Sequence, residues 1–175
     1  MEKGLVIIYT GEGKGKTTAA LGLVLRAAGY KRKVLIVQFG KASFSGEIES
    51  LKKFAPAVKI IQGGKGFVGI LGDNISLDQH RQAAEETYRL LYQEVVGGKW
   101  DIVVADEIIG AIAGKLLALA DIIKLVQDKP EKLNLVLTGR HAPLELIKLA
   151  DLVTEMKPIK HPFEKGIVAR EGIDY

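Results

Sequence analysis

Six short apolar runs, separated by helical patterns, constrain the fold of this 175-residue chain more than any other feature. Most of the runs are rich in Val and Ile and are apolar at consecutive positions, as strands are when helices cover both faces of a sheet. The runs cover residues 5–10, 34–39, 58–62, 101–106, 133–138 and 151–156. Because helical patterns lie between them, we expect right-handed crossovers and a mostly parallel sheet of about six strands.

The helices expected between these strands have recognisable ends. Ser76 and Gln79 form the pair of a capping box at the start of one pattern, and Pro143 suits the first turn of another. The helical patterns cover residues 17–29, 76–98, 108–129 and 142–150, and the third is expected to divide near residues 116–120. The alternation of strand and helix runs through the chain without a repeat or a linker.

Composition excludes several classes of protein. The chain has no cysteine, so disulfides, thiolate nucleophiles and cysteine-ligated metal clusters are excluded. No apolar run approaches the ~20 residues that span a bilayer, and the N-terminus lacks the apolar region of a signal peptide. The net charge of +4 suits an anionic small ligand but is too diffuse to indicate nucleic acid. We therefore expect one cytoplasmic domain over residues 1–175, with no membrane or nucleic-acid partner.

The stretch "TGEGKGKTT", residues 10–18, follows the first apolar run and opens a helical pattern. Glycines let backbone N–H groups turn toward an anion, and the following helix adds the positive end of its dipole. Lys16 would add a full charge, and the Thr17 hydroxyl can bind Mg²⁺. A glycine-rich turn without a ligand is the other interpretation, which the strand, Gly-Lys-Thr and helix together disfavour. The expected fold is therefore a single-domain, P-loop NTPase-like (RecA-like) three-layer α/β sandwich.

One residue of this loop departs from the common phosphate-binding pattern. G-x-x-x-x-G-K-[ST] places a glycine at position 10, where this chain has Thr10, and the first glycine is Gly11. We therefore expect the loop to hold a polyphosphate differently from an ordinary nucleotide hydrolase. Transfer of the γ-phosphate does not follow from the motif.

Charged residues also follow two later strands. Asp106 is the last residue of the run at 101–106 and Glu107 follows it, at the place where a P-loop protein has the acid that holds Mg²⁺ or its water. The residues alone do not say which of the two serves the metal. Arg140 follows the run at 133–138 and would reach a phosphate or the ribose from the same edge. A solvated acidic pair and a surface arginine are the corresponding alternatives.

The remaining polar features carry weaker signals. His80, which falls in a helical pattern, is expected to be solvated, and its distance from His141 and His161 makes a zinc site unexpected. Two segments lie outside the alternation of strands and helices. The glycine-rich segment 62–74 is expected either over the ligand edge or as an ordinary surface loop, and the tail at 157–175 as an irregular wrap around the domain.

Several motifs together resemble one family, the ATP:corrinoid adenosyltransferases of the cob(I)yrinic acid a,c-diamide type. They are "TGEGKGKTTAALG", "RAAGYKRKVLIVQFGK", "GKGF", "DIVVADEI" and "LTGRHAPLELIKLADLVTEMKPIKHPFEKGIVAREGIDY". The resemblance runs nearly from end to end. The short P-loop is typical of that family, and the tail is more specific than any P-loop, since generic NTPases lack it.

The resemblance implies a reaction in which triphosphate is a leaving group. A reduced corrinoid Co(I) attacks the 5′-carbon of ATP, a cobalt–carbon bond forms, and triphosphate departs. Catalysis then depends on positioning and on stabilising the departing charge, and the corrinoid supplies the metal chemistry. The family likeness also implies Mg²⁺ or Mn²⁺, a homodimer, and an electron donor such as a flavoprotein.

The resemblance also assigns roles to residues. It implies ATP binding by Gly11, Gly13, Lys14, Gly15, Lys16, Thr17 and Thr18, and metal binding by Glu107 together with Asp106. By their positions in the sequence, Glu12 and Arg140 are further candidates for ATP binding and Thr17 for metal binding. The expected catalytic residues are Lys16, Glu107 and Phe67. Phe67, in "GKGF", matches an aromatic residue that crowds the lower face of the corrin and eases reduction of the cobalt. A loop aromatic packed onto the core is the alternative for Phe67.

This chain departs from the family pattern on the presumed corrinoid side. Val68 and Gly69 replace a frequent tryptophan, Phe44 stands near the place of another, and "IIGAIAGKLL" lacks the tyrosine common in that helix. Two other functions therefore stay open at this point. One is an ATP-binding but non-catalytic carrier or sensor of a corrinoid or nucleotide, and the other is a P-loop phosphotransferase or ATPase with another acceptor.

Overall fold

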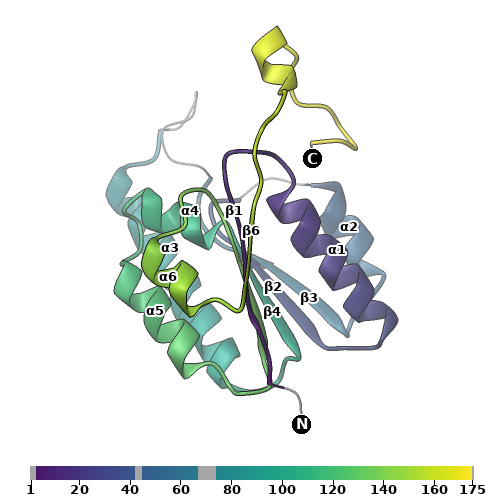
Figure 1. Ribbon diagram of the computed structural model, residues 1–175, viewed down its shortest axis with the longest axis vertical. Helices are drawn as coiled ribbons and strands as arrows, with labels where there is room; N and C mark the ends of the chain where they lie inside the picture. Colours follow the sequence, from purple (N-terminus) through teal and green to yellow (C-terminus); the bar gives the residue numbers. More distant parts are fainter. Residues whose placement is uncertain (1–2, 42–44, 67–73, 175) are drawn as a thin grey trace.

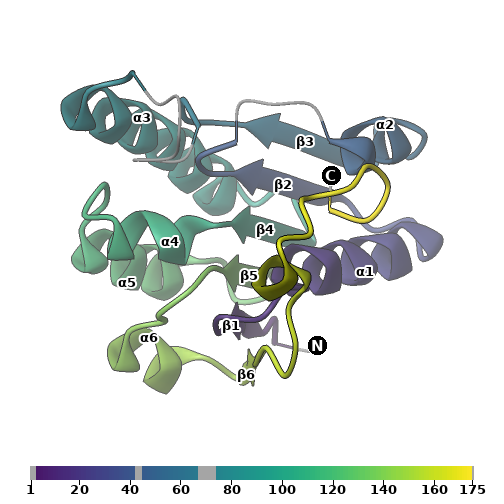
Figure 2. The same ribbon diagram turned by 90° about the horizontal axis from the view of Figure 1, so that it is seen from above.

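The computed structural model describes residues 3–41, 45–66 and 74–174, and its centre is a sheet of six parallel strands. The strand order is β3-β2-β4-β5-β1-β6 (Figure 2). The strands are β1 (Val6–Thr10), β2 (Val34–Gln38), β3 (Val58–Gln62), β4 (Ile102–Asp106), β5 (Asn134–Thr138) and β6 (Leu152–Glu155). Each lies within the apolar run that predicted it, so the parallel α/β sheet is confirmed.

Helices cover both faces of this sheet. The helices are α1 (Lys16–Gly29), α2 (Gly46–Lys52), α3 (Leu77–Val96), α4 (Ile108–Ala113), α5 (Leu119–Asp128) and α6 (Leu144–Leu149), with a 3₁₀ turn η1 (Pro162–Lys165). Figure 1 shows α1 and α2 on one face and α3 to α6 on the other. None of the described helices is both long enough and apolar enough to cross a membrane.

The helix predictions are confirmed with two corrections. Ser76 and Gln79 form the expected capping box, and the pattern at 108–129 divides into α4 and α5. Helix α2 was not predicted, because its sequence GEIESLK is short and presents only Leu51 to the core. Pro143 is the N-cap of α6 rather than a residue of its first turn.

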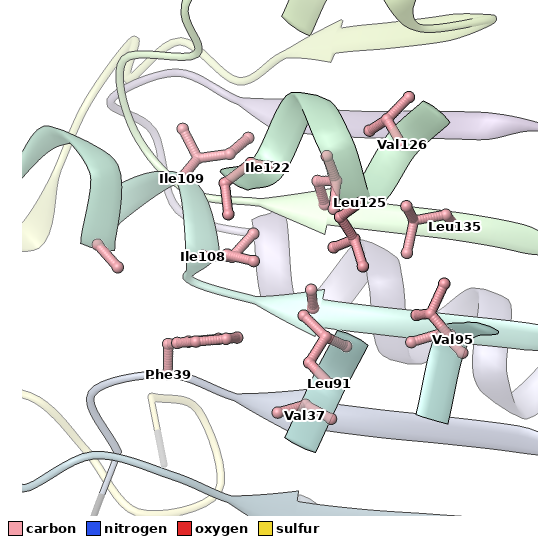
Figure 3. Close-up of a cluster of buried hydrophobic side chains, with 14 of the residues drawn as sticks. Val37, Phe39, Leu91, Val95, Ile108, Ile109, Ile122, Leu125, Val126 and Leu135 are labelled. Atoms are coloured by element: carbon pink, nitrogen blue, oxygen red, sulfur yellow. The ribbon is translucent and has the colours of Figure 1, made fainter. Parts of the chain in front are cut away.

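The strands alternate between two apolar cores. Leu35 and Val37 of β2 belong to the core beneath α3 to α6, whereas Val34 and Ile36 belong to the core beneath α1 and α2. Figure 3 shows the larger core, in which Phe39 lies at the end of β2 among side chains from α3 and α4. Burial on both faces explains why these strands read as continuous apolar runs.

Strand β6 is the exception to this rule. All four of its residues are exposed, unlike those of the central strands. The reason is that β6 is the edge strand, paired only with β1 in the described sheet. Its apolar letters resemble those of a central strand, but burial depends on neighbours that this position lacks.

The C-terminal tail does not wrap around the domain as expected. Its residues are almost all exposed, and in Figure 1 the segment extends beyond the carboxyl ends of the strands. It returns toward the sheet through an ion pair between Asp174 and Lys14. The tail therefore stands over the loop between β1 and α1.

Candidate functional site

The loop from Gly11 to Gly15 joins β1 to the N-terminus of α1, and Lys16 is the first residue of that helix. The Lys16 side chain is buried, and its Nζ donates to the carbonyl oxygens of Gly11 and Gly13, each at 2.7 Å. Burial lowers the pKa of Lys16, and the nearby carboxylate of Glu107 opposes that shift. The ammonium is thus held within the loop, next to the unpaired N–H groups of a helix start.

The glycines of this loop are also required by a neighbouring segment. The backbone N–H of Gly13 donates to the carbonyl of Met156, just beyond β6, at 2.7 Å. Gly11 has a φ of 98°, and a Cβ there would lie 2.4 Å from that same carbonyl oxygen. A side chain at Gly11 would therefore strain the backbone and collide with Met156. The glycine-rich composition serves this close approach as well as any bound anion.

Asp106, at the end of β4, is a buried hub of hydrogen bonds. Its Oδ1 accepts from the hydroxyls of Thr17 at 2.9 Å and Thr138 at 2.7 Å. Its Oδ2 accepts from Nε2 of Gln38 at 3.2 Å. Only 1% of Asp106 is exposed, so these donors replace the water that a carboxylate would otherwise need. Four segments of the chain therefore meet at one carboxylate.

Thr17 and Asp106 offer the hydroxyl and carboxylate oxygens that Mg²⁺ prefers. Within the described part of the chain, no group of three or more His, Cys, Asp or Glu side chains is placed to hold a metal ion. A Mg²⁺ ion here would therefore complete its shell with phosphate oxygens and water, as Mg²⁺ does in nucleotide sites. The residues present fit such a shared ion.

Glu107 differs from its neighbour Asp106 in both backbone and environment. Its φ is 62°, in the left-handed region, and its N–H donates to Oγ1 of Thr138 at 2.8 Å. Burial raises the pKa of Glu107, and the charge of Asp106 raises it further. The left-handed turn at Glu107 points the two acidic side chains in different directions. Asp106 is therefore enclosed, whereas Glu107 lines two cavities.

The first of these, the lysine-lined cavity, has a volume of about 480 Å³. Its lining includes Lys14, Lys16, Thr17, Lys41, Glu47 and Glu107. The second, the apolar cavity, has a volume of about 210 Å³. Its lining includes Phe39, Gly64, His80, Ala84, Glu107 and Ala111. Glu107 is common to both, so a ligand that fills the two would pass this carboxylate.

The structure brings together most residues of the predicted ATP and metal sites. Lys14, Gly15, Lys16, Thr17, Thr18 and Glu107 line the lysine-lined cavity, and Asp106 lies beneath it. Glu12 instead faces Arg140, with Oε2 3.5 Å from Nη1, and also lies near His141. Arg140 is exposed and is not part of the lining of that cavity.

Three other sequence-based predictions have different outcomes. His80 is buried at 3% exposure and lines the apolar cavity, so its predicted solvation is wrong. The face of α3 that carries His80 lines the apolar cavity, and the sequence pattern did not show that this face is buried. Of the described part of the glycine-rich segment, Gly64 and Gly66 line the apolar cavity, which agrees with the interpretation that places the segment over the carboxyl edge of the sheet. Phe67 and Phe44 lie outside the described residues.

Several site residues were missed from the sequence. Gln38 and Thr138 bind Asp106, and Lys41 and Glu47 line the lysine-lined cavity. Gln38 and Thr138 end the two strands that flank β4, so the available signal was their position at strand ends. The sequence does not give the strand order, and without it neither residue could be placed beside Asp106.

Comparisons with known proteins agree across the chain. Residues 2–175 match the family model described as ATP:corrinoid adenosyltransferase BtuR/CobO/CobP. The corrinoid adenosyltransferase of Escherichia coli K12 is 32% identical over 99% of this chain and 87% of its own length. That of a Sinorhizobium species is 36% identical over 99% and 81%, and that of Pseudomonas aeruginosa is 34% identical over 99% and 85%.

A solved structure supports the fold independently. A KaiC-like protein from Pyrococcus horikoshii superimposes with a TM-score of 0.62, covering 90% of this chain and 74% of that chain. The two are 20% identical in sequence, so the likeness concerns the fold alone. It agrees with the P-loop NTPase-like sandwich expected from the strand and loop pattern.

Proposed function

Because this chain belongs to the ATP:corrinoid adenosyltransferase family, which transfers the adenosyl group of ATP to a corrinoid, we propose how its two cavities divide that task. The triphosphate binds in the lysine-lined cavity, and the 5′-carbon lies at Glu107, where the two cavities meet. The observation that supports this division is the shared position of Glu107 between a cationic and an apolar cavity. The reaction then occurs at the boundary rather than at the terminal phosphorus.

The bonds balance without a general base. The electron pair of Co(I) forms the cobalt–carbon bond, the bond between C5′ and the phosphate oxygen breaks, and its electron pair leaves with triphosphate. No proton has to be removed from the nucleophile. The protein must instead stabilise the departing charge, which Lys16 and the backbone N–H groups at the start of α1 are placed to do.

A divalent ion, Mg²⁺ or Mn²⁺, would be held by Thr17 and Asp106, and Glu107, which lines the same cavity as Thr17, would bind its water. Such an ion supplies charge neutralisation on the phosphates. The protein side chains fix its place, because Thr138 and Gln38 orient the carboxylate of Asp106.

The apolar cavity is far smaller than a corrin macrocycle, so we propose that it receives part of the nucleoside. A cavity lined by Phe39, Ala84 and Ala111 suits a flat base, and Glu107, which also lines it, can accept hydrogen bonds from ribose hydroxyls. The corrin would then lie outside, across the exposed side of the 5′-carbon. Binding of the nucleoside in this cavity would thereby hold the 5′-carbon in position for attack by the cobalt.

Finer features of the function stay proposals. They are a preference for cob(I)yrinic acid a,c-diamide, a homodimer, a flavoprotein reductant, a cytoplasmic location, and the roles of Glu12, Phe67 and Arg140. The family resemblance supports the corrinoid preference, the homodimer, the reductant and the role of Phe67. Composition supports the location, and the positions of Glu12 and Arg140 in the sequence support their roles. Comparing cobyrinic acid a,c-diamide with cobalamin as the corrinoid tests the first of them directly.

The test of the reaction identifies its products. The protein is incubated with ATP, Mg²⁺ and chemically reduced Co(I) corrinoid, and the expected result is a light-sensitive cobalt–carbon spectrum with intact triphosphate. Release of ADP and phosphate would indicate a phosphotransferase or ATPase instead. Tight ATP binding without either product would indicate a carrier or sensor.

A further inference from the structure

Lys41 faces the same cavity as the phosphate loop, although no role has been assigned to it. It lies just beyond β2, which ends at Gln38, and it lines the lysine-lined cavity together with Lys14 and Lys16. Its side chain is only 20% exposed. Because β2 pairs with β4, the end of β2 brings this lysine to the carboxylate of Asp106.

The ammonium group of Lys41 lies between two carboxylates. Its Nζ is 3.4 Å from Oδ2 of Asp106 and 3.4 Å from Oε1 of Glu47. Both distances exceed the ~2.8 Å of a charge-assisted hydrogen bond. Lys16, by contrast, makes two contacts of 2.7 Å with loop carbonyls. The ion pairs of Lys41 are therefore long, and an anion at a shorter distance would bind its ammonium group more strongly.

The groups around Asp106 indicate when Lys41 would leave this carboxylate for another anion. Its Oδ1 is bonded by two hydroxyls, and its Oδ2 receives both Gln38 and the ammonium of Lys41. A divalent ion at Thr17 and Asp106 would repel the ammonium. A triphosphate in the cavity would attract it, since Lys41 lines the same space.

We propose that Lys41 is a phosphate-binding residue that moves from Asp106 to a triphosphate oxygen when metal and nucleotide bind. This rests on the proposed place of the triphosphate in the lysine-lined cavity. The movement replaces a long ion pair by a short charge-assisted bond. It also adds positive charge where the leaving triphosphate gains negative charge. Glu47 supports the Lys41 side chain from the α2 side of the cavity.

Equilibrium binding tests this role without relying on turnover. The wild type and the variants Lys41→Met, Lys41→Arg and Lys52→Met are titrated with inorganic tripolyphosphate, ATP and adenosine in the presence of Mg²⁺. Lys41→Met is expected to weaken tripolyphosphate and ATP by about 10- to 100-fold, the effect of losing one charge-assisted bond, and to leave adenosine unchanged. Lys41→Arg should keep most of the affinity. Lys52, which pairs with Glu49 on the exposed side of α2, is the matched control and should have no effect.

Other results would overturn the proposal, and they identify what failed. If the wild type does not bind tripolyphosphate, the placement of the triphosphate is wrong and the role of Lys41 falls with it. If the wild type binds it and Lys41→Met binds equally well, the role of Lys41 alone is wrong. Equal weakening of adenosine would show a general disturbance of the site, which also contradicts a phosphate contact.

A double variant separates phosphate binding from simple charge balance. If Lys41 only neutralises Glu47, then Lys41→Met combined with Glu47→Gln should recover the affinity of the wild type for tripolyphosphate, and the proposal is overturned. If Lys41 contacts the phosphates, the double variant stays weak. The second result is the one expected.

Discussion

The two cavities that meet at Glu107 are built in different ways. The lysine-lined cavity lies between the phosphate loop, the start of α1, α2 and the C-terminal tail, and Lys16 in its lining and Asp106 beneath it are held by hydrogen bonds within the fold. The apolar cavity is shaped mainly by small residues, such as Gly64, Ala84 and Ala111, which leave a space rather than make bonds. Under the proposed division, the first cavity would recognise the charge of the triphosphate, and the second would recognise the shape of the nucleoside.

This contrast has a consequence for substitutions. A change in the lysine-lined cavity removes a charge or leaves a buried partner unsatisfied, so its effect should be large and specific to phosphates. A change in the apolar cavity alters the fit of an uncharged group, and its effect should be smaller and confined to that group.

The largest effect is expected for Lys16→Ala. The change removes the charge that would face the departing triphosphate and should lower turnover by about 100- to 1,000-fold when the corrinoid is supplied as Co(I). The rate of formation of the cobalt–carbon spectrum measures it. Turnover within tenfold of the wild type would show that the lysine-lined cavity does not stabilise the leaving group.

A smaller effect is expected from filling the apolar cavity with Ala111→Leu. The added side chain should weaken adenosine and ATP by about tenfold and leave tripolyphosphate unchanged, because only the nucleoside would lose space. Ala113→Leu, at an exposed position of the same helix, is the matched control. Equal weakening of tripolyphosphate would break the distinction between the two cavities.

Thr138→Val tests the preset bonds beneath the lysine-lined cavity. Thr138 is buried, donates to Asp106 and accepts from the N–H of Glu107, so the change leaves two buried groups without this partner. The free energy of unfolding should fall by about 1–3 kcal/mol, which denaturant titration measures. The Mg²⁺ concentration needed for half-maximal turnover should rise, and Thr138→Ser should restore much of both losses.

The smallest effect is the pH dependence of stability from Glu107. Its pKa is raised above the ordinary value of 4.5 by burial and by Asp106, and the charges of Lys16, Lys41 and Arg140 oppose the shift only in part. The folded protein therefore keeps a proton that the unfolded chain releases, so stability should fall as pH rises from about 4.5 through the folded pKa.

Glu107→Gln should remove this loss. In the absence of divalent ions and nucleotide, the variant should melt above the wild type at neutral pH and should match it below pH 4. Thermal unfolding at several pH values measures the difference. A variant that melts lower than the wild type at neutral pH would show that Glu107 is stabilised in its charged form.

Much of the fold could be predicted because each central strand carries its own signal. The run "VLIVQ" of β2 is apolar throughout, since it is covered on both faces, and the capping box at Ser76 marks the start of α3 locally. Helix α2 and the exposure of β6 could not be predicted in this way. Their state depends on the neighbours that the chain brings to them, and no local pattern encodes those neighbours.

The candidate site divides along the same line. The nature of its chemistry was determined by the sequence, because a strand, a glycine-rich loop, Lys16 and Thr17 are consecutive and an acidic pair ends another apolar run. Only the tertiary structure decided that Thr138, Gln38 and Lys41 gather on Asp106, and that Glu107 lies between two cavities. A motif of consecutive residues can be read directly from the sequence. Contacts between the ends of distant strands depend on the strand order, which is selected by the packing of the whole sheet.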